Sequence, residues 1–360
     1  MKKSSVNHKR LASGFVLLMW IVSARAQSAV TLYGIVDSGL QYASKVATAS
    51  GGNAGNSFAF NNAGLGLSTF GLRGREDLGG GLSTNFDLES GISTANGGFA
   101  SSNGNFWGRR AWVGINGGLG EIRFGLQASP FFLTMFDSDP RSFSSFASGL
   151  VIYGDNVAFT GGMNSNAITY ISPKVAGFNA SAMFAPGGVA GNFQAGQQWS
   201  ASANYDTGTV MVNAAMYHGN AGGASTPVPT TVQFDGRTLG VAYRFNGFRL
   251  KASIVNYNVA GSLNEYVYGA GADYVVTPSV SVNAGAWFSI DRNHEPNHSL
   301  LAGVGATYLL SVRTALYAQA GMVSNHGKMN TGLSVTESSI MREVRNATAF
   351  GANFGIRHTF

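Results

Sequence analysis

Apolar and polar side chains alternate along short segments through most of the chain. In residues 82–89, apolar side chains and a threonine occupy the even positions, and polar or acidic side chains occupy the odd positions. The same alternation runs through residues 239–245, 248–254 and 280–290. A period of two with one apolar face predicts half-buried β-strands. A soluble β-sandwich would show the same pattern, so alternation alone leaves the fold class open.

The connections between these segments alternate between short and long. The short, turn-like ones are residues 75–80, 116–119, 173–176, 206–209, 246–247, 277–279 and 311–313. The long ones are residues 43–60, 93–105, 129–166, 185–196, 219–235, 258–266, 291–298 and 324–349. Tight turns at one end and longer loops at the other are typical of bacterial outer-membrane barrels. These connections join about sixteen strands, and a barrel of that size encloses an aqueous channel. The chain is therefore predicted to be all-β, a transmembrane antiparallel β-barrel of 16 strands.

Alternation stops for the whole of residues 129–166, which form one of the long connections. A connection of this length without regular structure is usually either functional or disordered. Disordered segments are poor in aromatic residues, whereas this one contains six phenylalanines. We therefore expect it to pack against the rest of the protein.

The first 26 residues have the pattern of an export signal. A basic start, a short apolar core at residues 11–23 and a small-residue site at residues 24–26 are the parts of a cleavable signal peptide. The alternative is a retained helical anchor, but the apolar run is shorter than the ~20 residues that a membrane helix needs. We expect the mature barrel to span residues 27–360 as a single domain. Five of the 23 basic residues lie in the signal, so 18 basic and 17 acidic side chains remain.

Composition narrows the class of protein. The mature chain is nearly neutral and has no basic stripe with interleaved aromatics, so nucleic acid is not an expected partner. Only 11% of residues are charged, against about 25% in soluble domains. Apolar runs of membrane-helix length are nevertheless missing after the signal. This combination favours a transmembrane β-barrel. The chain has no cysteine, which excludes disulfides and thiolate metal sites.

One motif suggests metal chemistry. Residues 294–298 match the pattern H-E-x-x-H, which binds zinc only on a helix that places both histidines on one face. Pro296 disfavours that helix, and the segment lies in a predicted loop. The other histidines of the mature chain are scattered, and neither a phosphate-binding loop nor a nucleophile elbow is present. We expect no catalytic residue, no bound metal and no cofactor.

Four stretches carry a resemblance to a known family. Residues 28–42, 71–91 (GLRGREDLGGGLSTNFDLESG), 106–127 and the ending GIRHTF resemble the general porins of Gram-negative proteobacteria, of the Neisseria/Bordetella/Burkholderia type. The resemblance implies an outer-membrane homotrimer whose third loop, residues 129–166, folds into the barrel. It also implies contact with outer-membrane lipid, lipopolysaccharide and the barrel-assembly machinery. That machinery would meet the C-terminal strand, where Phe360 shares one face with every second residue back to Phe350.

A pore of this kind needs a constriction lined by charges. The acidic side is predicted to come from Asp137 and Asp139 in the long loop. The basic side is predicted to come from the candidates Arg73, Arg75, Arg109, Arg110 and Arg141.

Arg109 and Arg110 are adjacent, so only one can face the lumen of a strand. The apolar positions 111, 113 and 115 place Arg110 inside. The family pattern instead favours Arg109, with Trp112 facing outward. Both arginines therefore remain candidates.

The chain departs from family members that carry a strong arginine ladder. It has Thr69, Leu126 and Met163 where those members have arginine. We therefore expect a general-diffusion porin that passes ions and small hydrophilic solutes with weak selectivity of uncertain sign. The alternatives are a solute-specific pore, a barrel whose external loops act as adhesin or receptor, and an outer-membrane enzyme.

Overall fold

The structure is a computed structural model that describes residues 29–48, 50–222, 232–335 and 344–360. The predicted signal peptide, residues 1–26, lies outside the described residues. Nearly all regular structure is β-strand, and every strand pairing is antiparallel. The strands form one sheet that closes on itself, because β1 (Ala29–Ala43) pairs with β17 (Thr348–Thr359).

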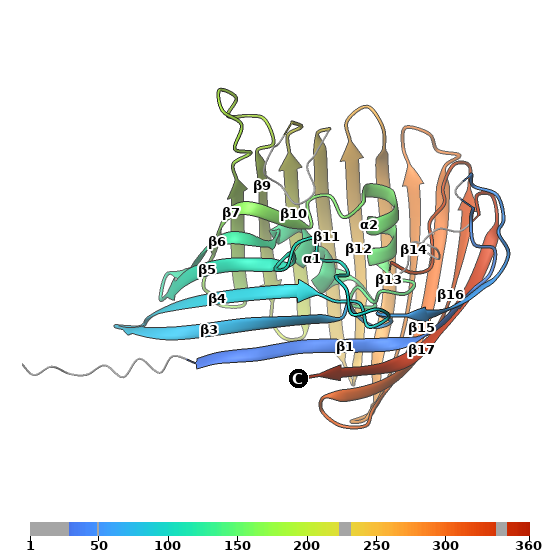
Figure 1. Cartoon of the computed structure of the whole chain (residues 1–360), viewed down its shortest axis with the longest axis horizontal. Coiled ribbons are helices and arrows are strands. Elements are labelled where there is room, and N and C mark those ends of the chain that lie inside the picture. The colour runs from blue at the N-terminus through green and yellow to red at the C-terminus, as the bar shows by residue number, and fades with distance from the viewer. Residues whose placement is uncertain (1–28, 49, 223–231, 336–343) are drawn as a thin grey trace, which may run out of the picture.

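The remaining strands follow one another around the ring in Figure 1. They are β2 (Ser57–Asn61), β3 (Thr69–Gly79), β4 (Leu82–Gly91), β5 (Arg110–Gly117), β6 (Gly120–Ala128), β7 (Met163–Ile171), β8 (Phe178–Ala185), β9 (Gln198–Asp206), β10 (Val210–Gly219), β11 (Phe234–Phe245), β12 (Phe248–Val259), β13 (Asn264–Thr277), β14 (Val280–Asp291), β15 (His298–Leu309) and β16 (Thr314–His326).

Two of these strands share one place in the ring. The C-terminal part of β1 pairs with β2, and its N-terminal part pairs with β3. The seventeen strands of the sheet therefore fill sixteen positions, which confirms the sixteen-stranded barrel.

One buried carboxylate stabilises the segment that joins β2 to β3. Asp37 accepts backbone N–H bonds from Gly64, Leu65 and Gly66 at 3.0–3.1 Å, and the Tyr317 hydroxyl donates to it at 2.6 Å. A Cβ at Gly64 would lie 2.3 Å from the Tyr317 hydroxyl oxygen. Only glycine fits at this close approach.

The two faces of the wall differ as the alternation predicts. Outward positions carry exposed apolar side chains, such as Leu239 (50% exposed) and Ile254 (44% exposed). Inward positions carry buried polar side chains, such as Asn213, Ser289 and Asn353. Exposed apolar area on this scale is unusual for a soluble monomer and fits a lipid-facing barrel wall.

The long connection after β6 holds two short helices that the sequence reading missed, α1 (Pro130–Ser138) and α2 (Gly149–Val157). Serine side chains start both: Ser129 accepts the N–H of Phe132 at 3.0 Å, and Ser148 accepts the N–H of Leu150 at 3.1 Å. Such caps satisfy backbone donors at a helix start. Neither described helix is long and apolar enough to cross a membrane.

The same connection is shorter than predicted. Strand β7 begins at Met163, which pairs with Ala128, so the loop ends at residue 162 rather than 166. We call residues 129–162 loop 3. Figure 1 shows both helices inside the ring of strands, where α1 packs against β8 to β12.

Candidate pore constriction

Aromatic packing fixes loop 3 to one side of the barrel. Phe131 of α1 lies 6.3 Å from the ring of Tyr217 and 6.4 Å from that of Tyr257. Tyr153 of α2 stacks on Tyr257 at 5.4 Å. All four side chains are fully or almost fully buried. Aromatic pairs at these distances add stability beyond the burial of their area, so the loop has a fixed position in the lumen.

Arg141 anchors the loop and does not line an open passage. It is 5% exposed. Its Nε donates to Asn283 Oδ1 at 2.8 Å, and its Nη1 donates to the carbonyls of Phe146 and Ala147 at 2.8 and 2.7 Å. Its Nη2 donates to Gln319 Oε1. Burial lowers the pKa of Arg141 to about 10. Its placement differs from the predicted role at the constriction.

Asp139 is also structural. It is 2% exposed, and its carboxylate accepts the backbone N–H groups of Arg141, Phe143 and Gly149 at 2.9, 3.0 and 3.0 Å. Burial raises the pKa of Asp139, and these three donors oppose the rise. The prediction paired Asp139 with Asp137 at the constriction, but the structure separates their roles.

Asp137 is the acidic candidate that reaches a cavity beside the barrel wall. Its side chain is exposed and lines a cavity of about 210 Å³ together with Arg244, Arg249 and Lys251. These basic side chains come from the wall strands β11 and β12. Partial desolvation raises the pKa of Asp137, although the nearby Lys251 lowers it. An acidic loop side chain therefore faces basic wall side chains.

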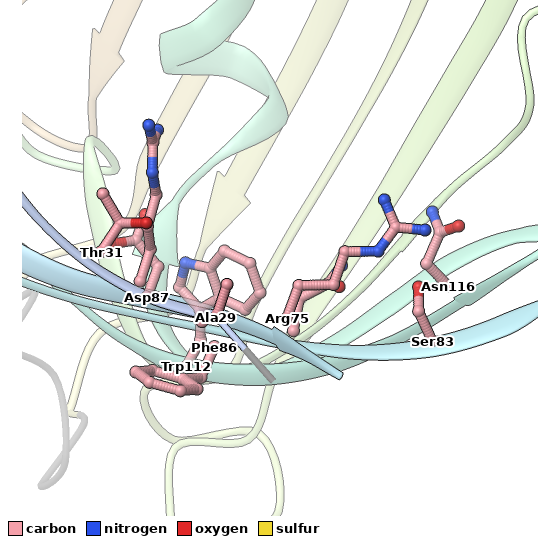
Figure 2. Close-up of a pocket in the computed structure, with 11 residues that line it drawn as sticks. Ala29, Thr31, Arg75, Ser83, Phe86, Asp87, Trp112 and Asn116 are labelled. Carbon is pink, nitrogen blue, oxygen red and sulfur yellow. The ribbon is translucent and has the colours of Figure 1, made fainter. Parts of the chain in front are cut away.

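Arg73 and Arg75 project from β3 into a second cavity, of about 450 Å³. Figure 2 shows Arg75 beside Asn116 and Ser83, with the Trp112 indole further along the same wall. The guanidinium carbon of Arg73 lies 5.1 Å from the centroid of the Tyr33 ring. Within the described residues, neither arginine forms an ion pair with a carboxylate.

Arg109 and Arg110 both contact Glu89. Arg109 Nε lies 2.8 Å from the Glu89 carboxylate. Arg110 Nη1 lies 3.1 Å from Asp87 and 3.6 Å from Glu89. Arg110 is the strand residue that faces the lumen, as the alternation indicates, while Arg109 precedes the strand. Both arginines are therefore partly neutralised.

The outward placement of Trp112 that the family pattern favoured is wrong. Trp112 lines the lumen cavity, while its neighbour Val113 on the other face is 53% exposed. The backbone period of two decides this point, since adjacent strand residues face opposite sides.

Sequence reasoning missed several lumen charges as site residues. Arg123 pairs with Glu121 at 2.7 Å, Arg244 with Asp206 at 2.9 Å, and Arg249 with Asp273 at 2.6 Å. Lys251 donates to the Asp139 carbonyl at 2.8 Å. A signal was present, because these residues occupy the polar positions of alternating segments. Glu121 lies two residues before Arg123 on the same strand. The partners of Arg244 and Arg249 lie on other strands, β9 and β13, which alternation within a single strand does not identify.

A second loop also reaches loop 3. Phe146 pairs with Ser334 in an isolated antiparallel bridge. The N–H of Ala147 donates to the Leu333 carbonyl at 2.8 Å, and the N–H of Gly332 donates to Asp155 at 2.7 Å. This segment after β16 belongs to the last long connection. Its inward course has no local sequence signal that we identified.

The H-E-x-x-H segment forms turns, not a helix. His294 Nδ1 lies 3.2 Å from Asp291, and the His298 ring stacks on His326 with 4.4 Å between centroids. Among the described residues, no group of three or more histidine or acidic side chains is arranged to hold a metal ion.

Comparison with known proteins gives consistent matches. A family model described as "Gram-negative porin" matches residues 16–328. The chain is 29% identical over 358 residues to outer membrane porin protein 32 of Delftia acidovorans, covering 94% of this chain and 96% of that protein. It is 34% identical over 182 residues to an outer membrane porin protein of Bordetella pertussis, covering 47% of this chain and 46% of that protein.

A solved structure agrees in fold. The anion-selective porin from Comamonas acidovorans superposes with a TM-score of 0.80 at 25% identity, covering 93% of this chain and 100% of that one. The match extends around the whole barrel and is not limited to a few strands.

Proposed function

Because the chain belongs to the Gram-negative porin family, we propose that its pore is a general-diffusion pathway with weak selectivity that favours anions. The protein is a passive channel of the outer membrane, as its relatives and its fold establish. The proposal concerns the ion selectivity of this channel.

The observation that carries it is the pairing of charges in the lumen. Five arginines lie against acidic side chains: Arg109, Arg110, Arg123, Arg244 and Arg249. Arg73 and Arg75 have no such partner among the described residues. Paired charges largely cancel at a distance, whereas unpaired ones set the field that a passing ion meets. Together with Lys251, these two arginines outnumber Asp137, the acidic side chain of the same lumen described above, so a small positive excess remains.

The test is a reversal potential measured across a planar bilayer with a salt gradient. We expect stepwise conductance and a small potential of the sign for anion preference. Replacing both Arg73 and Arg75 with glutamine should move the potential toward cations. A wild-type channel that clearly prefers cations would overturn the proposal.

We also propose that the barrel is a homotrimer. An aromatic cluster supports this, because Phe70 on β3 lies 6.0 Å from Phe106 and 5.6 Å from Trp107. Phe99 lies 5.9 Å from Phe106, and both are more than half exposed. Clustered exposed aromatics mark protein interfaces. Replacing Phe106 with serine should shift the purified protein from trimer to monomer in sedimentation, whereas replacing Phe193, an exposed phenylalanine outside this cluster, should not.

Contact with lipopolysaccharide is a further proposal. In the described strands, Arg237 is the one arginine or lysine on the outward face. An outward arginine costs ~2–4 kcal/mol at mid-bilayer and ~0–1 kcal/mol near the interface. Arg237 lies near the loop end of β11, where lipid phosphates could pair with it. Arg237→Gln should lower the lipopolysaccharide that copurifies with the barrel, whereas Arg313→Gln at a turn should not.

A further inference from the structure

The inward face of β3, β4, β5 and β6 forms a grid of aligned side chains. One row across the strands contains Arg73, Asp87 and Trp112. The next row toward the turns contains Arg75, Asn85 and Gly114, followed by Arg123 on β6. The third row contains Asp77, Ser83, Asn116 and Glu121.

The grid borders a cavity. Gly114 stands between Trp112 and Asn116 but does not line this cavity, because the Arg123 side chain packs over it: a Cβ at Gly114 would lie 3.1 Å from Arg123 Cγ. The cavity, of about 450 Å³, is lined by Arg73, Arg75, Asn85, Trp112 and Asn116, among others. A volume of this order fits a single-ring solute, because ligand pockets start at ~300 Å³.

The Trp112 indole is fixed in place from one side. The guanidinium carbon of Arg123 lies 4.3 Å from the centre of its ring, which is within cation–π range. Arg123 itself does not line the cavity, whereas Trp112 does. The part of the indole that borders the cavity is therefore a part that the guanidinium leaves uncovered.

The charge of the cavity is set by two arginines. Arg123 is paired with Glu121 at 2.7 Å, and Asp87 is paired with Arg110 at 3.1 Å. Arg75 and Arg73 have no acidic partner in the described part of the chain. Arginine binds carboxylates through two parallel hydrogen bonds. The cavity thus combines a free guanidinium with an aromatic face.

We propose that this cavity is a binding site for small aromatic carboxylates, with Arg75 holding the carboxylate and Trp112 stacking on the ring. The proposal deepens the general-diffusion function, on which it rests, by naming a solute class that the pore retains. The site lies toward the turn end of the barrel, separate from the Asp137 cavity, whose lining shares none of its residues. A solute would meet it on a different part of the path.

The experiment is a titration of the reconstituted channel in a planar bilayer, with chloride current as the readout. Benzoate and cyclohexanecarboxylate are compared, because both carry a carboxylate on a six-membered ring but only benzoate is aromatic. We expect saturable reduction of current by benzoate, with an apparent affinity about two- to tenfold higher than for cyclohexanecarboxylate. Equal affinities would overturn the role of the aromatic face.

Substitutions test the separate roles of Trp112 and Arg75 in binding the two acids. Trp112→Leu should make the two acids equal, and Trp112→Phe should restore the preference for benzoate. Trp199→Leu is the matched control, because Trp199 faces outward and is 39% exposed; it should leave benzoate binding unchanged. Arg75→Gln should weaken both acids together. Benzoate binding that survives both Trp112→Leu and Arg75→Gln would refute the site.

Failure of the general proposal gives a different result. A wild-type channel that prefers cations would contradict the proposed anion preference, yet it could still discriminate benzoate from cyclohexanecarboxylate. Conversely, an anion-preferring channel that treats the two acids alike would keep the general function and remove the aromatic site.

Discussion

The Nε of Arg141 donates a 2.8 Å hydrogen bond to Asn283, 142 residues away in the chain. With its bonds to two loop carbonyls and to Gln319, this side chain ties loop 3 to the strands β14 and β16. The space around it is tight, since a Cβ at Gly303 would lie 2.3 Å from Arg141 Nη1. The position of loop 3 therefore depends on this buried arginine, which holds the loop against β14 and β16.

Replacing Arg141 with alanine should loosen loop 3. The change leaves buried carbonyl and amide oxygens without a donor, at about 1–3 kcal/mol for each buried group left unsatisfied. We expect a lower thermal unfolding temperature and a single-channel current that is larger and noisier. Arg313→Ala, at an exposed turn, should change neither property. A quiet channel of wild-type stability in Arg141→Ala would show that the aromatic packing alone holds the loop.

Asp137 and Asp139 should respond differently to the same substitution. Asp137→Asn removes a charge from the lumen, so the reversal potential should shift toward anions while the stability stays close to that of the wild type. Asp139→Asn weakens the acceptor of three backbone N–H groups and should lower the unfolding temperature instead. Measuring the reversal potential and the unfolding temperature of both variants shows which aspartate sets selectivity and which one stabilises the loop. A selectivity change as large in Asp139→Asn as in Asp137→Asn would contradict the separation of roles.

Selectivity should depend on pH through Asp137. Desolvation raises the pKa of this carboxyl above its ordinary value, so it takes up a proton at a higher pH than a solvated aspartate. As pH falls through this raised pKa, the loop loses its negative charge and the pore should become more anion-selective. Reversal potentials measured from pH 7 downward test this sign. Asp137→Asn should remove the early part of the shift, and an unchanged pH profile in that variant would assign the titration to another group.

The candidate residues differ in how well their positions could be predicted from the sequence, depending on whether they lie in a strand or in a loop. Alternation within a strand is a backbone property, and in the structure Arg73, Arg75 and Arg110 share the inward face of their strands. Asp137 and Asp139 are also two residues apart, but they lie in loop 3, where residues two apart do not share a face as they do in a strand. Asp139 is buried and Asp137 is exposed. The burial of Asp139 depends on its bond to the Gly149 N–H and on the fixed position of Arg141, whose wall partners are more than 140 residues away. Such contacts leave no local pattern to read.

Phe360 extends the pairing between β17 and β1 and is expected to matter for assembly. The N–H of Gly34 donates to the Phe360 carbonyl at 3.2 Å, and the N–H of Phe360 donates to Gly34 at 3.1 Å. The Phe360 ring lies over Gly34, where a Cβ would come within 2.5 Å of it. The last residue thus occupies both a backbone and a packing position on β1. We propose that the barrel-assembly machinery engages this strand and its terminal aromatic.

Deleting Phe360 should lower the amount of folded barrel in the outer membrane. The deletion removes both backbone bonds to Gly34 and the aromatic at the membrane interface, where such girdles anchor barrels. Heat-modifiable mobility of outer-membrane fractions on gels measures the folded amount. Phe360→Tyr keeps the ring and the bonds and should assemble normally, whereas Phe360→Ala keeps only the bonds.

Refolding the purified variants in detergent separates loss of barrel stability from loss of recognition by the assembly machinery. If Phe360→Ala refolds normally in vitro yet is scarce in the membrane, recognition of the ring by the assembly machinery is the reason. Wild-type amounts of the deletion variant in the membrane would contradict any role for this residue.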